Sequence, residues 1–277
     1  MKIILSRKGF DSTAGGCPSP IVDGRPVPLP IPTTMPSPVA FGDLPALLAV
    51  AVADLTRGRI TPDQRCHLDP DIDRRLYPRP AGWRGALGQA GAAQGHLANQ
   101  GVGPGDLFLF WGLYRPVAPR GRWRFTGAKE HRLFGWLQVD EVVHVGRDPE
   151  PALRRHPWLA GHPHLQPGWG PNNAVYVAAR KLSLGGASPG IPGWGVMSRG
   201  LRLTVEKGSP KGPPSHWRCP DWLHPRSGGS GMTYHPPARW LDDGTVMAAA
   251  RGQEFVADVD DDPRAVDWIR RVLQEKG

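Results

Sequence analysis

The densest group of side chains that could bind a metal lies between residues 66 and 73. His67, Asp69 and Asp71 alternate with other residues, and side chains two apart in an extended segment project to the same side. Imidazole nitrogens and carboxylate oxygens bind divalent metals. The sequence therefore predicts a metal site at these three residues, with Asp69 and Asp71 also as catalytic groups. Ordinary turn chemistry, in which aspartates bond to nearby backbone, is the alternative.

The spacing leaves the metal open between iron and magnesium. A His-x-Asp pair supplies two of the three ligands of a facial-triad iron site, and the third could be His96, His235 or another distant histidine. An Asp-x-Asp pair equally suits a metal-bound diphosphate, as in sugar-nucleotide transferases. We therefore treat His96 and His235 as further catalytic candidates, and a divalent metal as the candidate cofactor.

A basic loop follows the first predicted strand, residues 3–5. It contains Arg7, Lys8 and Asp11 among serines and glycines, and such a loop can present cations and backbone N–H groups to a phosphate or sugar. We expect these three residues to bind substrate. Neither the Walker nor the Rossmann fingerprint is present, so a charged surface turn is the alternative.

A second polar group lies on a helix that we predict over residues 85–100. Gln89 and His96 stand there beside small residues, and amide side chains can read the edges of a base. We expect Gln89 to bind substrate. A solvated polar helix face explains the same pattern.

Two later segments carry groups that could join a site. His235 with Arg239 could act as a ligand or proton shuttle beside a phosphate clamp, or the segment could simply cover the core. Glu254, a further catalytic candidate, lies on a predicted late strand, somewhat like the terminal glutamate of ADP-ribosyltransferases. That similarity implies that Arg7 and Glu254 would hold NAD, but the serine-rich middle motif of those enzymes is absent.

Tryptophans accompany two apolar stretches within residues 102–146. A Gly-Asp turn followed by an apolar strand is similar to small PUA-like barrels of the EVE and YTH types, which bind modified bases or nucleic acid. The similarity implies that Trp111 and Trp136 stack on a base, a contact worth about 1–3 kcal/mol. A β-meander with tryptophans in its core is the alternative.

Composition limits what kind of protein could position these groups. The chain has 277 residues, with 36 glycines, 32 prolines and 11 tryptophans, so we expect a folded, loop-rich protein and exclude both a helical bundle and disorder. The net charge of +9 favours anionic partners, a nucleotide or nucleic acid. No apolar run is long enough for a signal peptide or membrane span, so we expect a cytoplasmic protein.

The pattern of elements favours one α+β domain over residues 1–277, with a mixed or antiparallel central sheet and few helices. We predict helices at residues 43–55, with Asp43 as the N-cap, at 85–100 and at 262–276, where Asp262 caps an apolar stripe. Between the last two helices, short apolar runs alternate with turns and predict strands.

Several motifs together resemble the nucleotide modification associated domain 3 family along nearly the whole chain. They are ILSRKGFDS at residues 4–12, GGCPSPI at 15–21, HLDPD at 67–71, GDLFLF at 105–110 and TYH at 233–235. The resemblance implies a role in the modification of nucleotides or DNA bases, and it assigns no residue roles.

These observations favour a metal-assisted enzyme that modifies a nucleotide or DNA base. A non-catalytic reader of modified bases and an iron oxygenase that tailors a peptide or small molecule are the alternatives. The enzymatic hypothesis requires the basic loop after residue 5 and the acidic stretch around Asp69 to meet in one cavity.

Overall fold

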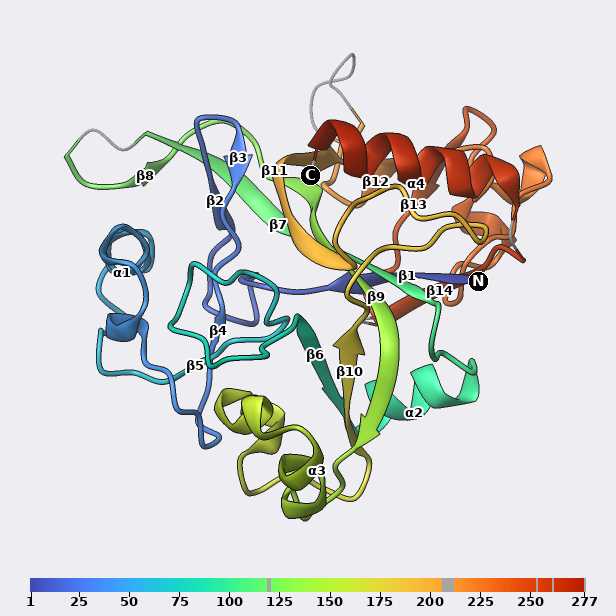
Figure 1. Ribbon diagram of the computed structural model, residues 1–277. Helices are drawn as coiled ribbons and strands as arrows, with labels where there is room; N and C mark the ends of the chain where they lie inside the picture. The colour runs from blue at the N-terminus through green and yellow to red at the C-terminus, as the bar shows by residue number, and fades with distance from the viewer. Residues whose placement is uncertain (119–120, 206–211, 253, 261, 277) are drawn as a thin grey trace.

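A mixed, ten-stranded sheet forms the centre of the computed structural model, which describes residues 1–277 except 119–120, 206–211, 253, 261 and 277 (Figure 1). The central order is β14-β1-β7-β9-β10-β6. Outside this order, β2 and β8 pair with β7, β3 pairs with β2, and β11 pairs with β9. Its strands are β1 (Lys2–Arg7), β2 (Ser19–Val22), β3 (Arg25–Pro26), β6 (Ala86–Ala90), β7 (Leu107–Ala118), β8 (Arg124–Phe125), β9 (Glu130–His144), β10 (Asn173–Ala178), β11 (Trp194–Arg202) and β14 (Glu254–Asp258).

The pairing directions confirm the expected mixed sheet. Strands β1 and β2 both run parallel to β7, and the other pairs are antiparallel. Two small ribbons lie outside the central sheet. They are β4 (Ile31–Pro32) with β5 (Cys66–His67), and β12 (His216–Arg218) with β13 (Thr245–Met247).

Both faces of the sheet are covered, which explains why β1 is a continuous apolar run. Ile3 and Leu5 point into one hydrophobic cluster, together with Trp111. Ile4 points to the opposite cluster, where it joins Phe108. A strand that is buried on both sides cannot show the alternation of a half-exposed strand.

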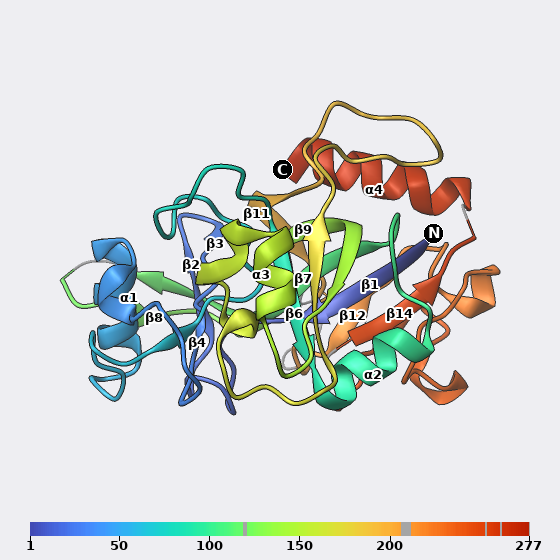
Figure 2. The ribbon, with the colours of Figure 1, turned by 60° about the horizontal axis from the view of Figure 1, so that its bottom comes forward.

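The sheet curves so that its edge strands β6 and β14 approach each other, with helix α2 (Gly91–Asn99) between them (Figure 2). The side chain of Gln89 on β6 donates a hydrogen bond to Glu254 on β14. No backbone ladder joins these two strands in the described part of the chain, so the sheet does not close into a barrel.

The helices correct two sequence predictions and confirm one. The predicted helix at 85–100 is wrong in its first third, because β6 pairs with β10 and α2 begins only at Gly91. Helix α1 (Ala46–Leu55) begins after Pro45, whereas Asp43 accepts a hydrogen bond from the backbone of Ala40. Helix α4 (Pro263–Lys276) agrees with the prediction, and α3 (Glu150–Arg155) is an additional short helix.

The segment that resembles a PUA-like barrel is not a separate unit. Its two long strands, β7 and β9, pair in the middle of the central sheet. Trp111 and Trp136 are only 1% and 4% exposed and belong to the hydrophobic core. The β-meander alternative therefore describes these strands, since apolar strands at a sheet centre place their large side chains inside.

Candidate functional site

The basic N-terminal loop and the acidic stretch meet at one cavity of about 270 Å³. Arg7 and Lys8 line it from the end of β1, and His67 and Asp69 line it from the segment that begins with β5. Further walls come from Asp11, Gln89, His164 and Trp169, among others. The spatial condition for the enzymatic hypothesis is therefore met.

Backbone contacts hold the acidic stretch beside β6. The N–H of Gly88 donates a 2.6 Å hydrogen bond to Asp69 Oδ1. Two residues later, Asp71 and Ala86 pair through both backbone hydrogen bonds. Because β6 is also the strand that carries Gln89, these contacts place Asp69 and Gln89 on the same cavity.

Three potential ligand side chains converge in this cavity. Atoms of His67, Asp69 and His164 that could bind a metal all lie within 4.8 Å of one another. The His67 Nε2 atom is 3.9 Å from Asp69 Oδ2, and the His67 and His164 rings have centroids 5.2 Å apart. Two imidazoles and one carboxylate form a donor set typical of divalent transition metals.

The surroundings of His164 orient its ring for such a role. Its Nδ1 lies 2.8 Å from Asn173 Oδ1, which can only accept, so Nδ1 carries the proton and Nε2 keeps a lone pair. The ring stacks on Trp169 with centroids 4.1 Å apart. On another side it lies against Gly88, where a Cβ would come within 2.1 Å of the ring.

Burial and neighbouring groups set the charges in this part of the cavity. Burial lowers the pKa of His67 to about 4 and that of His164 to about 3, so both rings are neutral at neutral pH. Burial opposes ionisation of Asp69, but the neighbouring imidazole of His162, whose Nε2 lies 3.4 Å from Asp69 Oδ1, and the charge of Lys8 hold the pKa of Asp69 well below the usual range. The group therefore combines one carboxylate anion with neutral imidazoles.

A second polar group, centred on Glu254, adjoins the cavity. The Glu254 side chain is buried, with 1% of the residue exposed. Its Oε1 accepts hydrogen bonds from Ser6 at 3.0 Å, from Lys8 at 3.3 Å and from Gln89. Its Oε2 has no hydrogen-bond partner among the described residues. Burial raises the pKa of Glu254, while the charge of Lys8 opposes that rise.

Asp71, predicted as a third metal ligand, does not join His67 and Asp69. Its carboxylate forms a two-point ion pair with Arg79 and accepts a 3.1 Å hydrogen bond from Trp83. Burial raises its pKa to about 6 in spite of Arg79. The alternation argument fails here because β5 ends at His67 and the chain beyond it is not a regular strand.

The remaining predicted catalytic histidines also lie outside the cavity. His96 on α2 contacts Thr233 Oγ1 at 3.3 Å. Both ring nitrogens of His235 bond to backbone, the carbonyl of Thr233 and the N–H of Ala249. Neither histidine approaches His67 and Asp69 as a third ligand.

Two predicted substrate-binding side chains, those of Arg239 and Asp11, are engaged in local structure. Arg239 donates to the carbonyls of Met247 and Ala248, which supports the view that its segment covers the core. Asp11 accepts hydrogen bonds from the backbone of its own turn, although it also lines the cavity. Arg7 makes a single long contact of 3.5 Å to Ala250 and is the less engaged cation at the cavity.

Sequence reasoning missed three residues of this site, His162, His164 and Trp169. His162 Nε2 lies 3.4 Å from Asp69 Oδ1, on the side away from solvent. A His-Pro-His triplet beside a tryptophan was the available signal, in the loop between α3 and β10. Nothing in its spacing relates it to residue 67, because the two segments meet only through their packing against β6.

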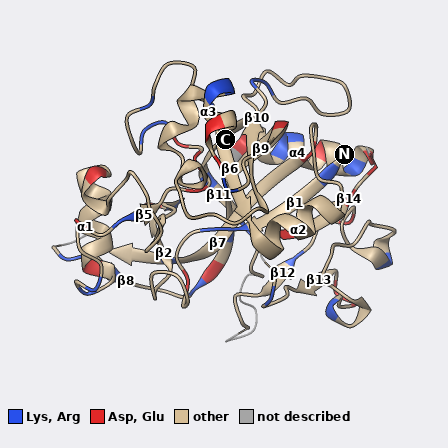
Figure 3. Cartoon of the chain, turned by 90° about the horizontal axis from the view of Figure 1, so that it is seen from below, with Lys and Arg blue, Asp and Glu red and all other residues tan. Residues whose placement is uncertain are grey.

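Positive charge is not confined to the cavity. In Figure 3, Lys and Arg are spread over many elements of the face in view. The local charges at the cavity therefore say more about its ligand than the net charge does. Among the described residues, no helix is both long and apolar enough to cross a membrane.

The family model described as nucleotide modification associated domain 3 matches residues 2–258. No curated protein and no solved structure matches the chain. The match includes every residue of the cavity, from Arg7 to Trp169, and also Glu254 beside it.

Proposed function

Because the chain belongs to the nucleotide modification associated domain 3 family, we propose that it is a metal-assisted enzyme that modifies a nucleotide or a nucleic-acid base. One observation carries the proposal. The potential ligands His67, Asp69 and His164 converge in a cavity that is also lined by the cations Arg7 and Lys8. Such a cavity can hold a metal and an anionic substrate side by side.

The donor set favours iron or another transition metal over magnesium. Magnesium prefers oxygen ligands and retains several waters, whereas two imidazoles and one carboxylate suit iron, manganese or zinc. His164 takes the place that the sequence had suggested for Asp71. When bound, the metal would supply Lewis-acid or redox chemistry at the cavity wall.

The substrate would contact the other walls of the cavity. Arg7 is placed to hold a phosphate, because only one long hydrogen bond engages its guanidinium. Trp169 offers an aromatic edge or face for a base, a contact worth about 1–3 kcal/mol. Glu254 acts as a positioning residue, since it holds Lys8 and Gln89 against the cavity.

Metal content of purified variants tests the proposal. We expect a divalent transition metal in the native protein by elemental analysis, and a loss of most of it in His164→Ala and in Asp69→Asn. The matched control is Asp73→Asn, a carboxylate whose partner is the exposed Arg75. Asp71→Asn distinguishes two ligand sets that share His67 and Asp69. The set suggested by the sequence requires Asp71 as its third ligand, whereas the set proposed here uses His164.

Two results would refute this function. The first is native protein that takes up no transition metal at equimolar supply, and the second is Asp69→Asn protein that keeps the metal. Protein that binds nucleotides equally well with and without metal, and forms no product, would instead be a reader. Oxygen consumption that depends on iron would show that the reaction is an oxidation.

A further inference from the structure

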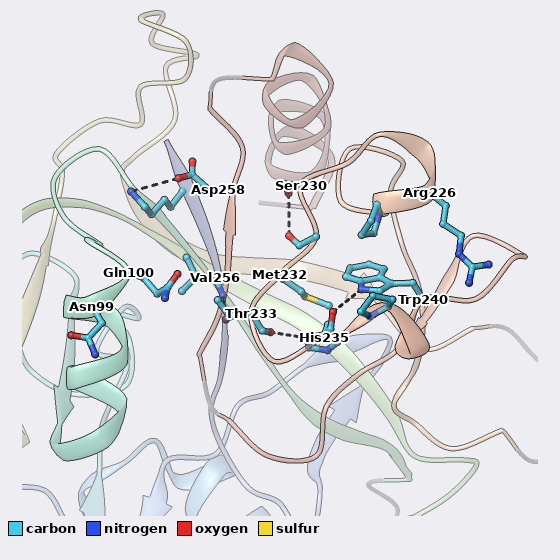
Figure 4. A pocket seen from close by; sticks show the side chains of 14 residues that line it. Asn99, Gln100, Arg226, Ser230, Met232, Thr233, His235, Trp240, Val256 and Asp258 are labelled. Carbon is cyan, nitrogen blue, oxygen red and sulfur yellow. Dashed lines mark hydrogen bonds and ion pairs between the residues drawn. The ribbon is translucent and has the colours of Figure 1, made fainter.

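A second cavity, of about 540 Å³, lies at the other end of α2 (Figure 4). Asn99 and Gln100 border it at the end of that helix, and Met232, Val256 and Trp240 add apolar surface. Its volume is within the range of small-molecule sites. No residue of the metal-ligand group lines it.

The second cavity offers free amides rather than free charges. Its two cations are already paired, Lys2 with Asp258 at 3.9 Å and Arg226 with Asp242. No described residue hydrogen-bonds to the side-chain amides of Asn99 and Gln100. Apolar walls with unpaired amide donors and acceptors fit a heterocyclic base better than a phosphate.

One face of α2 connects the two cavities. Ala93 lines the first cavity and Asn99 lines the second, with His96 midway between them. Residues three apart lie on the same helix face. Strand β14 follows the helix in the same order, because Glu254 contacts Gln89 beside the first cavity while Val256 lines the second. We call this strip between α2 and β14 the seam.

Tyr234 stands on the seam between the cavities. Its ring lies 4.8 Å from that of His96 and rests against Gly252, where a Cβ would approach the ring to 3.0 Å. The residue is nevertheless 47% exposed. These contacts hold an aromatic ring in a fixed orientation with part of its surface in solvent.

The backbone of Tyr234 is in a conformation that L-residues rarely adopt. Its φ is +65°, the left-handed region, in which a bulky non-glycine residue is strained by about 1–3 kcal/mol. The turn sends Tyr234 away from the second cavity, which Thr233 and His235 line on either side of it in the chain. Such strain is found where side chains are held for a ligand.

We propose that the seam binds a single-stranded nucleic acid, so that the substrate is a base within a strand and not a free nucleotide. This inference rests on the proposed function, which places the reacting base in the first cavity. Tyr234 then stacks on the neighbouring base, and Asn99 and Gln100 contact a further one. Ala93 and Asn99 are about 9 Å apart along the helix, the rise of two to three stacked nucleotides.

Binding of a short fluorescent single strand, measured by anisotropy, tests the seam. The probes are DNA and RNA strands of one mixed sequence, with a mixture of nucleoside monophosphates as competitor. We expect the strand to bind more tightly than the monophosphates. Tyr234→Asn should weaken strand binding about 5- to 150-fold and leave monophosphate binding unchanged, because one stacking contact is lost.

The variants are chosen so that misfolding cannot imitate the effect. Asparagine tolerates a positive φ, so Tyr234→Asn keeps the backbone turn. Tyr234→Trp should retain strand binding. Gln100→Ala should weaken strand binding alone, and Tyr77→Asn, a half-buried tyrosine away from the seam, is the matched control.

The outcomes separate the two proposals. A strand that binds no better than monophosphates overturns the seam, as does a folded Tyr234→Asn protein with native strand affinity. Tighter binding of the DNA or of the RNA strand identifies the sugar and supports the seam in either case. Loss of the metal or of monophosphate binding bears on the proposed function instead.

Discussion

Replacing Gly88 by alanine tests the geometry of the ligand group directly. A Cβ at this position would lie 2.1 Å from Cδ2 and 2.7 Å from Nε2 of His164. Because carbon atoms in contact are normally about 3.5 Å apart, the ring must retreat by more than about 1 Å. The backbone of Gly88 also donates to Asp69, so the same change disturbs two of the three proposed ligands.

The displacement sets the size of the expected effects. A shift of about 1 Å breaks the hydrogen bond of His164 to Asn173, now 2.8 Å, and disturbs its stacking on Trp169. Loss of such an orienting contact typically lowers metal affinity about 10- to 100-fold. Overpacking of a filled site costs about 1–3 kcal/mol, or a decrease of roughly 2–12 °C in Tm for a chain of this size.

Metal titration and thermal unfolding of Gly88→Ala measure both effects. Gly103→Ala is the control, since nothing lies within 4 Å of the Cβ position there. It should keep the native metal affinity and stability. A Gly88→Ala protein with native metal affinity and native Tm would show that His164 does not lie against β6, and the ligand group would have to be abandoned.

Three further predictions concern other buried groups. Burial lowers the pKa of His131 to about 3, so below pH 6.5 the unfolded chain binds more protons than the folded protein. The unfolding free energy should therefore fall by up to about 1.4 kcal/mol per pH unit as the pH decreases from 6.5. His131→Gln should reduce this pH dependence, measured by urea titrations at several pH values. Glu254→Gln leaves Lys8 without its buried partner and should cost about 3–5 kcal/mol in the same assay; a loss below about 1 kcal/mol would contradict the pairing. Gly195→Ala brings a Cβ within 2.5 Å of Trp136 and should cost about 1–3 kcal/mol while metal content stays native, and a loss of metal would show that the core and the site are coupled.

Local patterns in the sequence were sufficient for several elements. The apolar run that precedes Arg7 and Lys8 is a strand, and the stripe after Asp262 is a helix. In each case neighbouring residues alone determine the periodicity and the caps. The helix predicted at 85–100 shows the limit of this reasoning. Its first residues form β6, because pairing with β10 outweighs the local preference.

The tryptophans show a second limit. Trp111 and Trp136 were candidates for base stacking, but both are buried. Composition cannot separate a buried aromatic ring from one that lines a cavity, because the same apolar surface suits both. Trp169, which does line the cavity, lies in a loop that no strand or helix pattern marks.

Some residues of the candidate site could be predicted from the sequence, and others could be identified only from the tertiary structure. From the sequence alone, Arg7, Lys8, His67 and Asp69 could be named as residues of one site, because their types and local spacing suit phosphate and metal binding. Whether they meet was decided by the curvature of the sheet, which brings the end of β1 beside β6. Asp71 pairs with Arg79 and so does not join the candidate ligand group, whereas His164 joins it from a distant loop. Partners that are far apart in the chain are selected by packing in three dimensions, and they leave no periodic signal in the sequence.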